Sequence, residues 1–401
     1  MMFAKAALFA GVPLLLLAAA CSDPSSKSQP ANSQAANTQG GSPMVVAQLA
    51  PTPTAADVTS VQAPPEGDIR PDAPDSVIVG SASPLARRIE TAGWKAEPVT
   101  ALAKKDALLR AEVLLARAKF SPGVIDGQDG DNLKNAISAF EMAHSLPVDG
   151  KMTPAVWTAL AADKQPALTD YTITAADVKG PFLAKVPTEM AEMAKLPAMS
   201  FTGPVQELAE RFHMDPALLK SLNPNVDFTA AGTRIVVAAL GADKLKAPVN
   251  RIEVDKTKRE VRAYGADDLL LAVYPATVGS TDRPAPDGQW AVRTVASNPT
   301  YTYDPSRLTF GKASNGKLTI PPGPNNPVGS TWIDLTKDTY GIHGTPDPRL
   351  VGKTASHGCV RLTNWDVRQL SLAVKKGTKV DFVGVEQGPA DKRASKPKDA
   401  D

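Results

Sequence analysis

Short runs of alternating apolar and polar residues mark the C-terminal third of the chain. Arg251–Val254 and Glu260–Tyr264 alternate on either side of a polar turn, which predicts two antiparallel strands. A helical pattern predicts a helix from Asn364 to Lys375. Further strands are expected at Leu269–Thr277, Trp290–Val295 and Thr378–Val383. Short strands separated by Gly and Pro turns predict a mainly-β sandwich or barrel-like domain over residues 250–386.

Helical spacing dominates an earlier stretch, between Ala107 and Ala162, where apolar residues recur every three or four positions. Two Asp-Gly turns, at 126–127 and 149–150, interrupt this pattern. Thr153 followed by Pro154 is a typical helix start and begins the last run. These signals together predict a three-helix domain over residues 86–165.

Residues 170–240 combine both patterns. Helices are expected at Val205–Phe212 and Ala217–Leu222, followed by an apolar strand at 234–238, so a small α+β module is predicted. Between the later strands, Asn298–Ser330 is long, rich in Pro and irregular. Loops of that length in compact domains are usually functional, so a lid beside a site is expected there.

The N-terminus predicts export. An apolar run from Ala6 to Ala20 is too short to span a bilayer comfortably, so residues 1–20 are expected to be a signal peptide. The run ends at Cys21, which is either a lipidated first residue or the residue after plain signal-peptidase cleavage. Residues 21–85 and 387–401 are polar with few large apolar side chains, which is typical of a disordered tether and tail.

Composition bounds the class of protein. The 401 residues suit two or three domains, and a hydrophobic content of 43% allows sizeable cores. Lys and Arg number 44 against 42 Asp and Glu, giving a net charge of +2. No basic run with interleaved aromatic residues occurs, so no nucleic-acid partner is expected.

Cysteine and histidine are scarce, and half of each gathers in one segment. Of two cysteines and four histidines, Cys359, His343 and His357 lie within a short stretch. A cysteine needs a nearby imidazole to form a thiolate at neutral pH. Gly344 and Gly358 permit close backbone approach and positive φ beside them. A nucleophilic Cys/His site is therefore expected; the alternative is a buried free cysteine beside two surface histidines.

The remaining histidines, His144 and His213, are interpreted as capping or surface residues. Four scattered histidines and one thiol do not supply the spacing of a zinc site, so neither a metal nor a cofactor is expected. With Cys21 lipidated, Cys359 would be left unpaired in an oxidising compartment, which favours a reactive thiol over a disulfide.

A longer motif surrounds the Cys/His pair. It reads Ser-His-Gly-Cys-Val-Arg-Leu at 356–362, preceded by Ile-His-Gly-Thr at 342–345. This closely resembles the signature of the YkuD-type L,D-transpeptidases, bacterial cell-wall enzymes, and the resemblance covers about Arg251–Val385. It implies that Cys359 is the acyl-accepting nucleophile and His343 its base, with the Gly344 carbonyl bonded to the other ring nitrogen.

The same resemblance implies supporting roles. Backbone N–H groups around His357, Gly358 and Cys359 would form an oxyanion hole, with the His357 side chain supporting rather than basic. Arg361 either pairs with a substrate carboxylate or ties down its loop. The residues expected to contact substrate are Arg361, Ser356, Tyr340 and Trp332.

The implied reaction is peptidoglycan cross-linking, with a role in wall organisation and cell shape. A Cys359 thiolate attacks a stem peptide where an L-centre meets a D-centre, and the amine of a second stem resolves the thioester. Water as acceptor would make the protein an L,D-carboxypeptidase, and a lipoprotein amine would make it an anchoring enzyme. A non-catalytic wall-binding lipoprotein is the rival class. The resemblance also implies inhibition by carbapenems.

The two preceding modules resemble wall binders. Residues 86–165 resemble the three-helix peptidoglycan-binding domain, and residues 170–240 resemble a LysM module. Expected partners are therefore peptidoglycan stem peptides and glycan strands, and a membrane through a lipid anchor on Cys21. The protein is expected in the periplasm or elsewhere in the cell envelope.

Overall fold

The structure, a computed structural model, describes residues 79–94, 100–279, 284–305, 316–354 and 358–386. All of these residues belong to one unit of the chain, Leu49–Asp401. The predicted signal peptide, Cys21, the polar tail, Ser356 and His357 lie outside the described residues, as does most of the predicted tether. No helix within the described ranges is long and apolar enough to cross a membrane.

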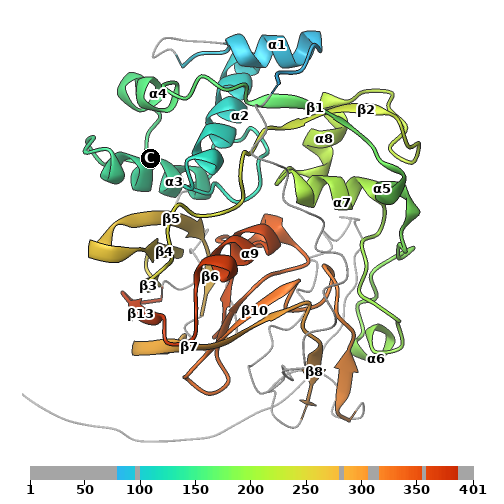
Figure 1. Cartoon of the computed structure of the whole chain (residues 1–401), viewed down its shortest axis with the longest axis vertical. Helices are drawn as coiled ribbons and strands as arrows, with labels where there is room; N and C mark the ends of the chain where they lie inside the picture. Colours follow the sequence, from blue (N-terminus) through green and yellow to red (C-terminus); the bar gives the residue numbers. More distant parts are fainter. Residues whose placement is uncertain (1–78, 95–99, 280–283, 306–315, 355–357, 387–401) are drawn as a thin grey trace, which may run out of the picture. The chain divides into compact units, whose positions relative to one another are not determined.

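A nine-stranded sheet dominates the C-terminal part of the described chain (Figure 1). Its strands are β3 (Arg251–Asp255), β4 (Glu260–Tyr264), β5 (Leu270–Pro275), β6 (Thr277–Val278), β7 (Gly288–Ser297), β10 (Thr331–Leu335), β11 (Gly341–His343), β12 (Val360–Arg361) and β13 (Lys379–Val383). Their spatial order is β5-β4-β3-β13-β7-β10-β11-β12-β6. Only Ala276 separates β5 from β6 in the chain, yet these strands occupy opposite ends of that order. The sheet therefore curls back on itself, and the predicted mainly-β, barrel-like fold is confirmed.

The helix α9 (Asn364–Ala373) lies against this sheet, over β10 and β11 (Figure 1). Val367 of α9 is fully buried in the main apolar cluster together with Ile342 of β11. The helix begins where the Thr363 hydroxyl accepts a hydrogen bond of 3.1 Å from the backbone N–H of Asp366, a side-chain N-cap.

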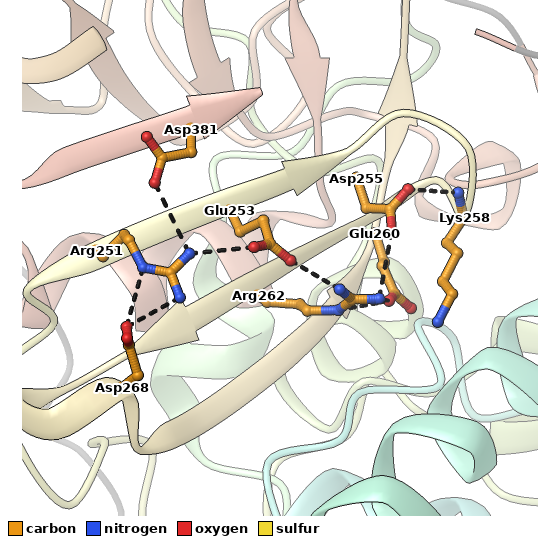
Figure 2. A network of polar contacts seen from close by, with 8 residues as sticks. All are labelled: Arg251, Glu253, Asp255, Lys258, Glu260, Arg262, Asp268 and Asp381. Atoms are coloured by element: carbon orange, nitrogen blue, oxygen red, sulfur yellow. Dashed lines mark hydrogen bonds and ion pairs between the residues drawn. The ribbon is translucent and has the colours of Figure 1, made fainter. Parts of the chain in front are cut away.

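On β3 and β4, the face of the sheet that points away from the apolar core carries a network of ion pairs (Figure 2). Arg262 bonds Glu260 and lies 2.7 Å from Glu253, while Arg251 lies 3.1 Å from Glu253 and 3.0 Å from Asp268. Because successive side chains point to opposite faces of a strand, the apolar residues between these charges face the core.

The first four helices of the described chain form a helical unit: α1 (Pro84–Thr91), α2 (Ala101–Arg117), α3 (Asp131–Ala143) and α4 (Pro154–Leu160). The sequence predicts the last three, whereas α1 begins inside the predicted tether. The prediction of disorder is wrong for residues 79–85, because Gly80 bridges to Thr169 and the Ser81 N–H donates to the Leu168 carbonyl at 3.3 Å. The segment is held by pairing with a strand that the sequence analysis did not predict.

The two Asp-Gly turns share one physical cause. Gly127 and Gly150 have φ of +70° and +68°, a conformation that favours glycine. In each turn the glycine N–H donates to a buried glutamate carboxylate: Gly127 to Glu112 at 2.7 Å and Gly150 to Glu141 at 2.9 Å. Each glutamate thereby satisfies buried backbone donors that the turn leaves without a partner.

The middle unit consists of β1 (Leu168–Thr172), α5 (Ala175–Lys179), α6 (Met190–Met193), α7 (Pro204–Arg211), α8 (Pro216–Leu222) and β2 (Arg234–Ala238). β1 and β2 pair antiparallel. Of the residues in β1 only Leu168 is buried, so no alternating pattern marks this strand in the sequence. The predicted strand at 234–238 and the two later helices are confirmed.

Backbone and ring contacts connect these units. The Ser121 N–H donates to the Val273 carbonyl at 2.8 Å, which adds a short segment of the helical unit to β5. The Ile125 N–H donates to the His213 carbonyl at 2.8 Å, and the His213 ring stacks on Trp365 of α9 at 4.8 Å. His213 thus joins the middle unit to the sheet unit and is more than a surface residue. His144 is the C-cap of α3, as expected of a capping residue, and its ring stacks on Phe140.

The predicted irregular loop at Asn298–Ser330 contains regular structure within its described part. β8 (Tyr301–Tyr303) and β9 (Leu318–Ile320) pair antiparallel, so the expectation of a wholly irregular loop is wrong there. Tyr301 and Ile320 are fully buried, which supplies the apolar contact that holds the pair.

Candidate active site

Three neighbouring strands each place one side chain on the same face of the sheet. Trp332 of β10 lies opposite His343 of β11, and Arg361 of β12 lies beside His343 in a parallel pair. Val360 points to the other face, into the main apolar cluster. Cys359 directly precedes Val360 and packs with Trp332 in a different cluster. Strand alternation therefore brings Cys359 and His343 to the same side of the sheet.

Hydrogen bonding defines the tautomer of His343. Its Nδ1 lies 2.7 Å from the carbonyl oxygen of Gly344. A carbonyl oxygen can only accept, so Nδ1 carries the proton and Nε2 keeps a free lone pair. Nε2 is buried and has no hydrogen-bond partner among the described residues. The imidazole is thus arranged to accept a proton at Nε2.

The surroundings of His343 keep it neutral. Burial and then the positive charge of Arg361 lower its pKa to about 3, although the carbonyls of Gly344 and Val328 act in the opposite direction. The Trp332 ring stacks on the imidazole at a centroid distance of 5.4 Å and an interplanar angle of 19°. At neutral pH the side chain is therefore a fixed, uncharged base.

Cys359 is a buried cysteine, 1% exposed. Its Sγ lies 3.9 Å from the carbonyl oxygen of Thr339, the length of a weak S–H bond. Burial lowers the pKa of Arg361 to about 10, while the nearby Cys359 and Asp347 act to raise it. A guanidinium held in this position favours the thiolate form of its neighbour.

Both motif glycines are required by close approaches. A Cβ on Gly344 would lie 2.1 Å from Oδ1 of Asn364. Gly358 has φ of +117°, and a Cβ there would lie 3.0 Å from the Tyr340 ring. Neither position accommodates a side chain without movement of its neighbours.

The residues predicted to contact substrate differ in exposure, and some lie outside the described residues. Arg361 and Trp332 are 6% and 2% exposed and line the His343 face. Tyr340 is partly buried, and its hydroxyl lies 3.5 Å from the Pro284 carbonyl. Ser356 and His357 lie outside the described residues. Within the described ranges, no group of three or more His, Cys, Asp or Glu is placed to hold a metal ion.

Asn364, the first residue of α9, is a site residue that sequence reasoning missed. Its Oδ1 accepts hydrogen bonds of 3.1 Å from the N–H groups of both Ser330 and Thr345. These two residues lie at the ends of the loops that carry the Pro-rich segment and the His-Gly pair. Asn364 therefore sets the backbone around His343. In the sequence, its position five residues after Cys359 could have indicated that it lies at the site.

The middle unit also reaches the site. Met190, Met193 and Met199 pack in one apolar cluster with Cys359 and Trp332. The Met199 N–H donates to the Pro322 carbonyl at 2.8 Å, and the Met199 carbonyl accepts from the Asn325 N–H at 2.9 Å. The sequence analysis assigned this stretch only to a glycan-binding module, whereas the structure places it against the wall of the candidate site.

Comparison with known proteins identifies the family. The L,D-transpeptidase catalytic domain (YkuD) family matches residues 249–382, and the family described as "Putative peptidoglycan binding domain" matches residues 105–160. "Putative L,D-transpeptidase YqjB" of Bacillus subtilis is 36% identical over 133 residues, which is 32% of this chain and 67% of that protein. The chain belongs to the YkuD family of L,D-transpeptidases, and it is an enzyme of that class.

Two further similarities are weaker in identity. "Putative L,D-transpeptidase YkuD" of Bacillus licheniformis is 28% identical over 181 residues, covering 44% of this chain and 92% of that protein. A solved structure of L,D-transpeptidase 3 from Mycobacterium tuberculosis, in complex with a faropenem-derived adduct, has a TM-score of 0.28 and 18% identity. That similarity covers 34% of this chain and 60% of the other chain.

Proposed function

We propose that this protein is exported and cross-links peptidoglycan stem peptides, with Cys359 as the nucleophile and His343 as its base. The observation that carries the proposal is the state of His343: its Nδ1 is bonded to Gly344, and its buried Nε2 has no hydrogen-bond partner in the described part of the chain. Its side chain lies on the face of the sheet where Cys359 packs with Trp332. A thiol and a neutral imidazole in one buried place are the components of a cysteine acyl transfer.

The reaction proceeds in two halves. His343 Nε2 takes the proton of the Cys359 thiol, and the thiolate attacks the stem-peptide carbonyl at the L–D junction. The C–N bond to the terminal D-amino acid breaks, and the departing amine receives the proton from His343. An amine of a second stem then attacks the thioester, its proton passes to His343, and Cys359 leaves. Ping-pong kinetics follow from the covalent intermediate.

Charged and polar neighbours support each state. Arg361 favours the negative charge on the Cys359 sulfur, and the Gly344 carbonyl stabilises the imidazolium that forms when His343 gains the proton. Backbone N–H groups around His357, Gly358 and Cys359 are proposed to bind the oxyanion. Arg361, Ser356, Tyr340 and Trp332 are proposed to contact the stem peptide.

The other parts of the chain are proposed to bring the enzyme to its substrate. The match at residues 105–160 supports binding of peptidoglycan by the helical unit, and residues 170–240 are proposed to act as a LysM-like module. A signal peptide over residues 1–20 and lipidation of Cys21 would hold the protein in the cell envelope. The domain limits of 86–165, 170–240 and 250–386 are part of this proposal.

Mass analysis of peptidoglycan fragments tests the function. Purified protein is incubated with disaccharide-tetrapeptides, and products are compared with those of Cys359→Ala. Cross-linked dimers that depend on Cys359 support transpeptidation. Tripeptides without dimers would replace it by L,D-carboxypeptidation, and transfer only to a lipoprotein amine would replace it by anchoring. No product from the wild type would leave a wall-binding role for the protein.

Exposure to a carbapenem gives a second readout of the same thiol. A thiolate beside an oxyanion hole can open the strained β-lactam carbonyl to form a thioester. Intact-protein mass spectrometry should show a gain of one drug mass in the wild type and none in Cys359→Ala. An adduct that survives this substitution would place the nucleophile elsewhere.

A further inference from the structure

The peptide group between Gly344 and Thr345 is hydrogen-bonded at both ends. Its carbonyl oxygen accepts the Nδ1–H of His343 at 2.7 Å. Its N–H donates to Oδ1 of Asn364 at 3.1 Å. A bond accepted at one end of an amide polarises the amide and strengthens the bond at the other end. The strength of the hydrogen bond to Asn364 therefore affects the hydrogen bond made by the His343 imidazole.

The amide of Asn364 uses all of its hydrogen-bonding capacity. Oδ1 accepts from Thr345 and Ser330, and Nδ2 donates to the Pro324 carbonyl at 3.2 Å. Nδ2 also lies 3.1 Å from each carboxyl oxygen of Glu210. Two donors face Oδ1 and two acceptors face Nδ2, so the orientation of the amide is unambiguous.

Glu210 lies on α7, in the middle unit, and is the end of this chain of bonds. Burial raises its pKa to about 8, the nearby Glu207 adds to the effect, and the bond from Asn364 opposes it. Glu207 is itself paired with Arg211 at 2.8 Å on the same helix. From the facing elements, α9 presents the neutral Asn364 and the Pro-rich loop presents the Pro324 carbonyl.

We propose that Glu210 is a positioning residue of the active site, which holds His343 in its Nδ1–H tautomer and raises the basicity of Nε2 through Asn364 and the Gly344–Thr345 peptide. The proposal rests on the function proposed above. In a Ser-His-Asp triad a carboxylate bonds the imidazole directly. Here two amides stand between the carboxyl group and the imidazole. The effect is largest when Glu210 is ionised, because a charged acceptor makes the stronger bond.

The consequence concerns the middle unit. A module that only binds glycan would alter the capture of substrate and leave the chemistry of a small reagent unchanged. A module that supplies Glu210 alters the reactivity of Cys359 toward any acyl donor, including one too small to touch the module. The two roles therefore predict different results with a carbapenem in solution.

The test is the rate of carbapenem acylation of the full chain, followed by intact-protein mass spectrometry between pH 5 and 9. Glu210→Gln keeps an acceptor for Asn364 and removes the charge. Above pH 8 the variant is expected to react roughly tenfold more slowly than the wild type, and the difference should disappear near pH 6. Glu192→Gln, at an exposed ion pair with Lys195, is the matched control and should follow the wild type.

Thermal unfolding separates positioning from a structural role. Ionisation of Glu210 costs folding stability because its pKa is raised to about 8, so the melting temperature of Glu210→Gln should lie above that of the wild type at pH 8, and activity falls while stability rises. Equal rates for Glu210→Gln and the wild type at every pH would overturn the proposal, as would a rate loss accompanied by lower stability. A wild type without any Cys359-dependent adduct would instead overturn the proposed function.

Discussion

Replacement of Gly344 by alanine is expected to damage both stability and catalysis, through Asn364. The new Cβ would lie 2.1 Å from Oδ1 of Asn364. Non-bonded heavy atoms settle near about 3.5 Å, so the oxygen has to move by roughly 1 Å or more. That movement breaks the two 3.1 Å bonds from Ser330 and Thr345. Each buried donor left without a partner costs about 1–3 kcal/mol, so the loss of both bonds should lower the free energy of unfolding by roughly 2–6 kcal/mol.

The same movement displaces the carbonyl that holds His343. A misplacement of about 1 Å near a reacting group costs roughly 10²-fold in rate, so carbapenem acylation should slow by about that factor. Urea unfolding gives the stability and intact-mass kinetics give the rate. Gly93→Ala is the control, because its Cβ would meet only Trp157 Nε1 at an ordinary 3.8 Å. An unchanged urea midpoint together with an unchanged rate for Gly344→Ala would refute the role given to this contact.

Three further outcomes are expected. Cys359→Ala should form no adduct, and His343→Gln should slow acylation by about 10²–10⁴-fold; a variant of His343 that acylates at the wild-type rate would exclude it as the base. Asp366, buried beside Ser121, has a pKa raised to about 7, chiefly by burial, so wild-type stability should fall as pH rises from about 4 to 7. Asp366→Asn should flatten that dependence in urea unfolding, and equal slopes would contradict the assignment. Trp365→Ala removes the ring that stacks on His213 and should lower the free energy of unfolding by roughly 3–5 kcal/mol. An unchanged free energy of unfolding would mean that the units are energetically independent.

Local patterns were sufficient for much of the fold. Glu260–Tyr264 and the strand at 234–238 agree with β4 and β2 because alternation and flanking turns are encoded within a few residues. β1 escaped prediction because four of its five residues are at least partly exposed and only its pairing with β2 makes it a strand. α1 escaped because the polar sequence before it gave no sign of the partner at Thr169.

The candidate site divides in the same way. The Cys-His-Gly residues lie within one short segment, so the sequence alone predicts Cys359, His343 and Gly344 as the reactive group, and the YkuD comparison confirms the family. Only the tertiary structure decided what surrounds them. The strand register sets Trp332 and Arg361 beside His343, and Glu210, far from the motif in sequence, bonds Asn364 from another unit. A motif can be recognised because its reactive residues lie close together in the sequence. Polarisation and burial of those residues depend on partners from distant segments, which meet only when the chain folds.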